Sequence, residues 1–142
     1  MEDSARMSAP ERLRAAGMRV TSARLAILDV IGEGQHPGAD DVARAVRERV
    51  GHVTLQAIYE ALGAFTEAGL LRKIDFGNGA ARYETRVGDN HHHLVCRECG
   101  AVADVDCVVG AAPCLEPAAA LGYVIDEAVV TFRGLCANCQ DA

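Results

Sequence analysis

The segment VTLQAIYEALGAFTEAGLLRKIDFGNGAARYE, residues 53–84, decides the fold of the first half of this chain. Its first part carries apolar residues at helical spacing, which are Leu55, Ile58, Leu62 and Phe65. Thr54 is a suitable N-cap before them and Gly69 a suitable stop, so the pattern predicts a helix. The short alternating runs around Gly77-Asn78-Gly79 indicate a β-hairpin directly after this helix.

Shorter helices are predicted upstream of this segment, because apolar residues again repeat at helical spacing between start signals and glycines. These helices are expected at residues 10–17, 21–32 and 40–51. Three or four short helices followed by a hairpin make a winged helix-turn-helix. In such a domain the helix that begins after Thr54 is the recognition helix.

The face of that helix turned away from its apolar stripe is expected to meet DNA. Gln56 can bond to an adenine edge, and Ala57 or the Tyr59 ring can contact thymine methyl groups. Tyr59 lies four residues after Leu55, so a partly buried position stays open for it. Glu60 is repelled by phosphate unless it accepts from a cytosine amine or faces away. The basic residues assigned to the DNA backbone are Arg19, Arg72 and Lys73, with Arg82 beside them on the hairpin.

The net charge of −6 alone argues against a nucleic-acid binder, but its distribution differs between the two halves. Residues 1–90 carry 12 basic and 13 acidic side chains, whereas residues 91–142 carry 2 and 7. A folded first half can gather its basic residues on one face, or they can form a solvated surface of mixed sign.

The second half is dominated by two Cys-x-x-Cys pairs, Cys96/Cys99 and Cys136/Cys139, with a run of three histidines at 91–93. The 36 residues between the pairs are enough to fold back and complete a tetrahedral site of four thiolates for zinc or iron. The histidines suggest a second metal. A pair of redox-active dithiols is the alternative, but neither pair has the strand-then-helix context of a redox enzyme.

The composition favours an intracellular protein that uses a structural metal. The chain shows no signal peptide and no long apolar run, so a cytoplasmic location without a membrane partner is expected. In a reducing compartment six cysteines favour metal or redox chemistry over disulfides. Only 4% of the residues are aromatic, so a small domain built from this chain has a thin core that a metal can reinforce.

The expected fold class is α+β, with an N-terminal winged helix-turn-helix followed by a small α/β dimerisation domain. Short strands near residues 94–95, 102–105 and 129–132 and a helix at 116–121 are predicted in the second domain. An exposed strand edge there can pair with a second copy, and two copies explain recognition of a palindrome. The expected limits are 1–84 for the DNA-binding domain, 85–90 for a polar hinge and 91–142 for the metal-binding dimerisation domain.

The order of these motifs resembles the ferric uptake regulator family of metal-dependent repressors. The similarity covers nearly the whole length and is carried by RVTSAR at 19–24, VTLQAIYEAL at 53–62, EAGLLRK at 67–73, ARYE at 81–84 and HHHLVCRECG at 91–100. Within the family, residues 87–107 and APCL at 112–115 are similar to actinobacterial repressors of the FurA and CatR types, which control catalase genes.

The resemblance implies two metal sites in each subunit. A structural zinc is implied at Cys96, Cys99, Cys136 and Cys139. A regulatory Fe²⁺ or Mn²⁺ is implied at His36, Glu84, His91, His93 and Asp104. Imidazole and carboxylate ligands suit those metals. Asp106 competes with Asp104 because the two would share a strand face, while His52 and His92 are interpreted as surface residues.

The resemblance also implies a mechanism. Metal ligands from both domains would select one angle between them, and that angle would set the spacing of the two recognition helices on a palindromic operator. Peroxide could release the DNA by oxidising a metal ligand such as His36 or His91, or the spare thiols Cys107 and Cys114. Catalase genes and the chain's own gene are then the expected targets. The best-known peroxide sensors of the family carry Asp at the position of Glu84, so a plain iron-responsive repressor stays open.

Other function classes fit the sequence less well. A zinc hydrolase would need an open metal position and a general base, which His91, His93 and Glu84 could imitate. A catalytic domain does not require a winged helix with Gln56 and Tyr59 exposed, so no enzyme is expected. A zinc-stabilised protein-interaction module is the remaining alternative, and specific DNA binding would exclude it.

Overall fold

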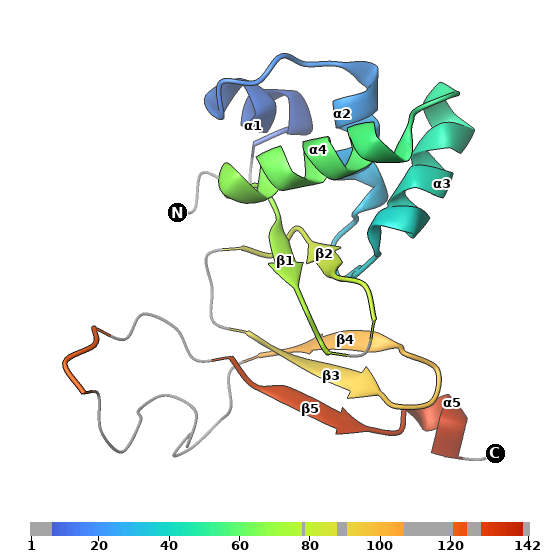
Figure 1. The fold of residues 1–142 in the computed structure, drawn as a ribbon, viewed down its shortest axis with the longest axis vertical. Helices are drawn as coiled ribbons and strands as arrows, with labels where there is room; N and C mark the ends of the chain where they lie inside the picture. The colour runs from blue at the N-terminus through green and yellow to red at the C-terminus, as the bar shows by residue number, and fades with distance from the viewer. Residues whose placement is uncertain (1–6, 78, 88–90, 107–120, 125–128, 141–142) are drawn as a thin grey trace. The chain divides into compact units, whose positions relative to one another are not determined.

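The computed structural model describes residues 7–77, 79–87, 91–106, 121–124 and 129–140. It divides into two compact units, Met1–Gly88 and Asp89–Ala142. Figure 1 shows the order of their elements along the chain. The division falls inside the segment 85–90, where a polar hinge is predicted.

In the described part of the first unit, four helices precede a two-stranded hairpin. The helices are α1 (Ala9–Ala15), α2 (Ser22–Val30), α3 (Ala39–Val50) and α4 (Leu55–Glu67). The strands are β1 (Arg72–Ile74) and β2 (Arg82–Glu84), which pair antiparallel with Lys73 opposite Tyr83. This order of helices and hairpin is the predicted winged helix-turn-helix.

The ends of the helices follow from local side-chain chemistry. Thr54 caps α4, since its Oγ1 accepts a hydrogen bond from the backbone N–H of Ala57 at 3.1 Å. Gly69 follows the end of α4 with φ of +77°, a conformation that favours glycine. Helix α3 begins one residue before the predicted Asp40, because the Asp41 carboxylate reaches back to accept from the Gly38 N–H at 3.3 Å.

Apolar side chains from all four helices form the core of the first unit. The most deeply buried of them are Leu13, Ile27, Ile31, Val42, Val46, Ile58, Leu62 and Phe65. Leu55 was expected in this stripe, and that expectation is wrong because its side chain is 38% exposed. It is the first residue of α4, almost one turn before Ile58, so it lies beyond the edge of the packed face.

In the described part of the second unit, a three-stranded sheet is followed by a short helix. The elements are β3 (His92–Cys96), β4 (Val102–Val105), β5 (Thr131–Gly134) and α5 (Ala137–Gln140). The strand order is β4-β3-β5, with β3 antiparallel to β4 and parallel to β5. The helix predicted at 116–121 lies almost wholly outside the described residues. None of the helices described in either unit is long and apolar enough to span a membrane.

Candidate metal centres

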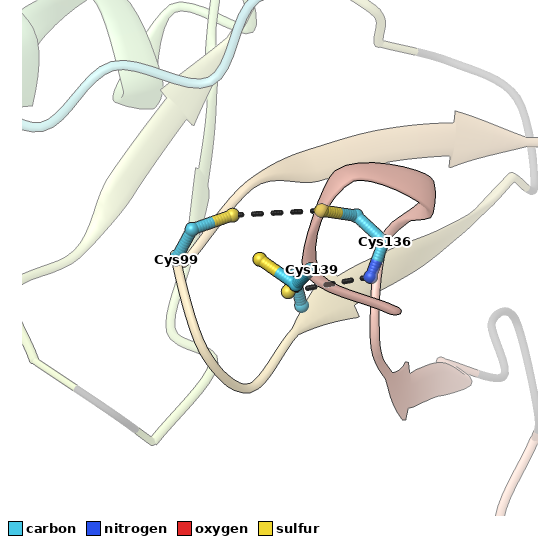
Figure 2. A group of neighbouring side chains, drawn as sticks. Cys99, Cys136 and Cys139 are labelled. Carbon is cyan, nitrogen blue, oxygen red and sulfur yellow. Dashed lines mark hydrogen bonds between the residues drawn. The ribbon is translucent and has the colours of Figure 1, made fainter. Parts of the chain in front are cut away.

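Four cysteines converge at one end of the sheet in the second unit. Their Sγ atoms all lie within 4.8 Å of one another. Figure 2 shows Cys99 and Cys136 pointing toward each other from separate turns, with Cys139 between them. The cluster consists of Cys96, Cys99, Cys136 and Cys139, and will be called the cysteine cluster.

The parallel pairing of β3 with β5 brings the two Cys-x-x-Cys turns together. Cys96 ends β3 and lies opposite Gly134, two residues before Cys136. Each pair then folds as a tight turn, in which Gly100 N donates to Cys96 O and Cys139 N to Cys136 O, both at 3.1 Å. The backbone N–H of Cys136 also donates to Cys96 Sγ at 3.3 Å, which ties one turn to the other.

The geometry of the cysteine cluster fits a tetrahedral metal ion. Cys99 Sγ and Cys136 Sγ are 3.7 Å apart. Two thiolates of a tetrahedral zinc site are separated by about 3.8 Å when each Zn–S bond is about 2.3 Å. This pair of sulfurs is therefore spaced as in a zinc site, and the other two lie within 4.8 Å.

The electrostatics of the cluster also favour metal binding. Backbone N–H groups of Cys99 and Cys136 lower the pKa of the Cys96 thiol to about 6, because they stabilise its thiolate. Hydrogen bonds with the neighbouring sulfurs, Cys136 first, raise the pKa of Cys139 to about 12. One thiolate is thus available near neutral pH, and binding of a cation would displace the protons that the remaining thiols share.

The first unit contains a buried histidine–carboxylate pair. His36 Nε2 lies 3.1 Å from Glu84 Oε2, and both side chains are only 2% exposed. Glu84 ends β2, while His36 lies in the loop that leads into α3. Ionised carboxylates are buried only when they are paired or bind a cation. The pair offers one imidazole nitrogen and one carboxylate to a metal.

The second unit contains two histidines that face one carboxylate. His93 Nε2 lies 3.2 Å and His91 Nε2 3.5 Å from Asp104 Oδ1. Ligands at right angles around an ion with bonds of about 2.1 Å are about 3.0 Å apart, so three such atoms can share one ion. His93 is directly opposite Asp104 in the β3–β4 ladder, which explains the contact. Asp106, the competing candidate, is exposed beyond the end of β4.

His92 differs from the prediction. It was interpreted as a surface residue, but its side chain is fully buried, and its Nδ1 accepts a hydrogen bond from the Val130 N–H at 3.3 Å. The cover is local to this end of β3, where the backbone before β5 contacts the ring, because Leu94 on the same face of the strand is 47% exposed. Nothing in the run of three histidines indicates that the middle one is buried. His52 is exposed, as expected.

The residues assigned to DNA lie in the first unit. Those that are exposed are Arg19, Gln56, Ala57, Tyr59 and Lys73, and Arg72 is half-buried. The Tyr59 side chain is 48% exposed, so it is not a core residue. Glu60 lies one turn after Gln56 in this helix, and its Oε1 accepts a hydrogen bond from Gln56 Nε2 at 3.2 Å. The redox candidates Cys107 and Cys114 lie outside the described residues.

Comparisons with known proteins agree with this geometry. A sequence model of the ferric uptake regulator family matches residues 15–110. The transcriptional regulator FurA of Mycobacterium tuberculosis is 50% identical over 130 residues, which cover 92% of this chain and 88% of that protein. Ferric uptake regulation protein 1 of Mycolicibacterium fortuitum is 51% identical over 129 residues, 91% of this chain and 80% of the relative.

A solved structure gives the same result for the fold. The ferric uptake regulator of Pseudomonas aeruginosa, determined with manganese, superposes with a TM-score of 0.67 at 26% identity and covers 92% of this chain and 99% of its own. Because the family match and the two relatives each extend over about two thirds of the chain or more, they show the family and not only the fold. This chain belongs to the ferric uptake regulator family of metal-responsive transcriptional regulators, and to its actinobacterial FurA subgroup.

Proposed function

We propose that this chain is a metal-dependent, homodimeric repressor that binds a palindromic operator in the cytoplasm. The observation that carries the proposal is the chemistry of the two buried ligand groups. His36 with Glu84 and His91 with His93 and Asp104 are the same kind of donor set, imidazole and carboxylate, in two separate units. One regulatory ion that takes ligands from both units would tie the DNA-binding domain, 1–84, to the domain 91–142.

The ligand chemistry separates the two metals. Thiolates select zinc, so the cysteine cluster would hold one structural Zn²⁺ in each subunit. Histidine and carboxylate donors suit Fe²⁺ or Mn²⁺, which bind more weakly and can dissociate when the metal becomes scarce. Manganese in the related Pseudomonas aeruginosa regulator supports this assignment.

The regulatory metal would act by selecting a conformation. Without it the two domains would sample many relative orientations, and only a fraction of these would present both recognition helices correctly. An ion bound by both domains favours the competent orientation, and the affinity for DNA rises in proportion to its population. In a dimer the two recognition helices would read two half-sites of a palindrome with Gln56, Ala57 and Tyr59.

We further propose that peroxide releases the iron form from DNA, which would place catalase genes and the chain's own gene under its control. In this step a ring carbon of His36 or His91 would gain one oxygen atom from hydrogen peroxide, whose O–O bond breaks, and the other oxygen would leave as water. Iron held by these residues would supply the redox chemistry that breaks the O–O bond. An oxidised imidazole no longer donates to the metal. The high identity with mycobacterial FurA supports this subgroup assignment. A repressor that responds to iron alone is the second candidate, and a zinc-stabilised interaction module the third.

The test is fluorescence anisotropy of the dimer on DNA from its own promoter, with the zinc retained. Mn²⁺ should lower the dissociation constant by about tenfold or more, since coupling free energies are typically about 1–3 kcal/mol. Glu84→Gln should abolish that effect, because the amide cannot replace the carboxylate as an anionic ligand. His52→Ala removes an exposed histidine from the same unit and should behave as the unchanged chain.

The outcomes separate the candidates. Loss of DNA binding on addition of peroxide with Fe²⁺ but not with Mn²⁺ supports oxidation of a histidine ligand. Loss with both metals that a thiol reductant reverses points to the cysteines, including Cys107 and Cys114. If peroxide has no effect but a chelator releases the DNA, the chain is a plain metal sensor. If the chain binds no DNA specifically under any of these conditions, the zinc-stabilised interaction module is the candidate that remains.

A further inference from the structure

We propose that Arg82 is a positioning residue that couples the His36–Glu84 half-site to the recognition helix. The proposal rests on the function proposed above, in which His36 and Glu84 bind the regulatory metal. It assigns a route inside the DNA-binding domain, separate from the orientation of the two domains. The route consists of the segment 36–38, strand β2 and the cavity between α3 and α4.

The first step of the route is the contact between β2 and the residues around His36. Arg82 and Glu84 lie two apart in β2 and therefore project from the same face of the strand. Arg82 Nη1 donates to the backbone carbonyl of His36 at 3.2 Å, while Glu84 Oε2 contacts its imidazole at 3.1 Å. One strand thus holds His36 at two points, the main chain and the ring.

The second step fixes the chain between His36 and α3. The backbone N–H of Tyr83 donates to Pro37 O at 3.0 Å, and Gly38 forms a β-bridge with Arg82. Gly38 is also the N-cap of α3, tied to it by the Asp41 carboxylate. The segment 36–38 is therefore held against β2 up to the residue that caps α3.

The third step reaches the DNA-reading side chain. A cavity of about 330 Å³ lies at the N-terminal end of α3, and it is lined by Gly38, Asp41 and Arg44, by Tyr59 of α4, and by Gly79 and Arg82 of the hairpin. Arg82 thus touches the carbonyl of a metal ligand and lines the same cavity as Tyr59. Tyr59 is a residue assigned to base contacts.

The coupling follows from these contacts. A metal on His36 and Glu84 would add a further tie between the segment 36–38 and β2, beside the Tyr83–Pro37 hydrogen bond and the Gly38–Arg82 bridge, and it would restrain the His36 carbonyl that accepts from Arg82. The guanidinium would then stay in one position in the wall of the cavity that Tyr59 also lines, which would limit the positions open to the ring before it meets DNA. When the metal leaves, that tie is lost and the His36 carbonyl is less restrained, which would weaken the charge-assisted hydrogen bond that it accepts from Arg82.

The experiment compares the metal effect in matched variants. Dissociation constants for promoter DNA are measured by anisotropy with and without Mn²⁺, zinc retained, for the unchanged chain, Arg82→Gln, Arg82→Lys and Lys73→Gln. Lys73 is exposed on the same hairpin, so its replacement removes an equal charge without touching His36. Mn²⁺ affinity measured by calorimetry in the presence and absence of DNA gives the same coupling from the other side, because linkage is reciprocal.

The expected result is a change in the ratio of the two dissociation constants and not only in their size. Lys73→Gln should raise both constants by a similar factor and keep the ratio. Arg82→Gln should reduce the ratio by about fivefold or more, close to the lower end of common coupling factors. Arg82→Lys retains the charge and a donor, so it should restore part of the ratio, and it also serves if Arg82→Gln does not fold.

The experiment distinguishes failure of the proposed repressor from failure of the proposed role of Arg82. If the unchanged chain shows a ratio near one, the metal-dependent repressor is refuted and the role of Arg82 falls with it. If the unchanged chain responds to Mn²⁺ and Arg82→Gln keeps the full ratio in both assays, the repressor stands and only the coupling through Arg82 is wrong.

Discussion

Loss of one zinc thiolate should unfold the second unit and leave the first intact. Among the described residues of the second unit, the buried apolar side chains are only Val95 and Cys96. Full burial of one such side chain contributes about 1.5–3 kcal/mol, and three buried histidines lie beside them. A structural zinc contributes an apparent binding free energy of about 10–16 kcal/mol at pH 7. A zinc ion held by the four cysteines would therefore contribute more to stability than any side chain among the described residues of this unit.

The perturbation is Cys139→Ser, which removes one of four ligands and changes little else in volume. We expect zinc content to fall from one ion per chain toward zero. Fast amide exchange should then appear throughout β3, β4 and β5, while amides in α3 and α4 stay protected. The matched control is Ala137→Ser, which places the same hydroxyl at an exposed position of α5. Hydrogen exchange read by mass spectrometry after short peptide digestion resolves the two units separately.

The reasoning would be refuted if Cys139→Ser lost its zinc and yet kept slow exchange in β3 to β5. That result would mean that the residues outside the described set supply a core large enough to hold the sheet alone. Loss of protection in both units at once would also contradict it, because the two units would then fold as one.

Two further predictions concern the first unit. Phe65→Ala should lower its free energy of unfolding by about 3–5 kcal/mol in urea titrations, whereas Leu55→Ala in the same helix should cost less than about 1 kcal/mol, since Leu55 lies outside the core. Burial, with a smaller contribution from Tyr59, raises the pKa of Tyr83 above its ordinary value of 10.0. Above about pH 10 the unfolded chain therefore loses this proton first and stability falls as pH rises, so the urea midpoint of Tyr83→Phe should depend less on pH in this range.

The sequence predicts the first unit well because its signals are local. Caps and glycines lie next to the helices that they delimit, and Thr54 and Gly69 mark the ends of α4 as expected. The failure at Leu55 concerns packing, since helical periodicity gives the face of a residue but not how far along the helix the neighbouring helices extend.

The candidate sites depend on register, which a single sequence does not give. The choice of Asp104 over Asp106 follows from the pairing of Asp104 with His93 across β3 and β4. The burial of His92 is a long-range feature as well, because the backbone at Val130, 38 residues further along the chain, contacts its ring. Cysteine spacing did predict four sulfurs at one site, but the parallel pairing of β3 with β5 that brings them together was not predicted.

The parallel pairing of β3 with β5 has a consequence during synthesis. Strands β3 and β5, and the two cysteine turns that follow them, are far apart in the chain, since Cys136 follows Cys99 by 37 residues. At translation rates of about 5–20 residues per second, this interval lasts roughly 2–7 s. Throughout it the nascent chain carries Cys96 and Cys99 as a half-made site, while every residue of the winged helix is already synthesised. The ribosome thus completes the winged-helix domain first and the sheet that the metal would stabilise last.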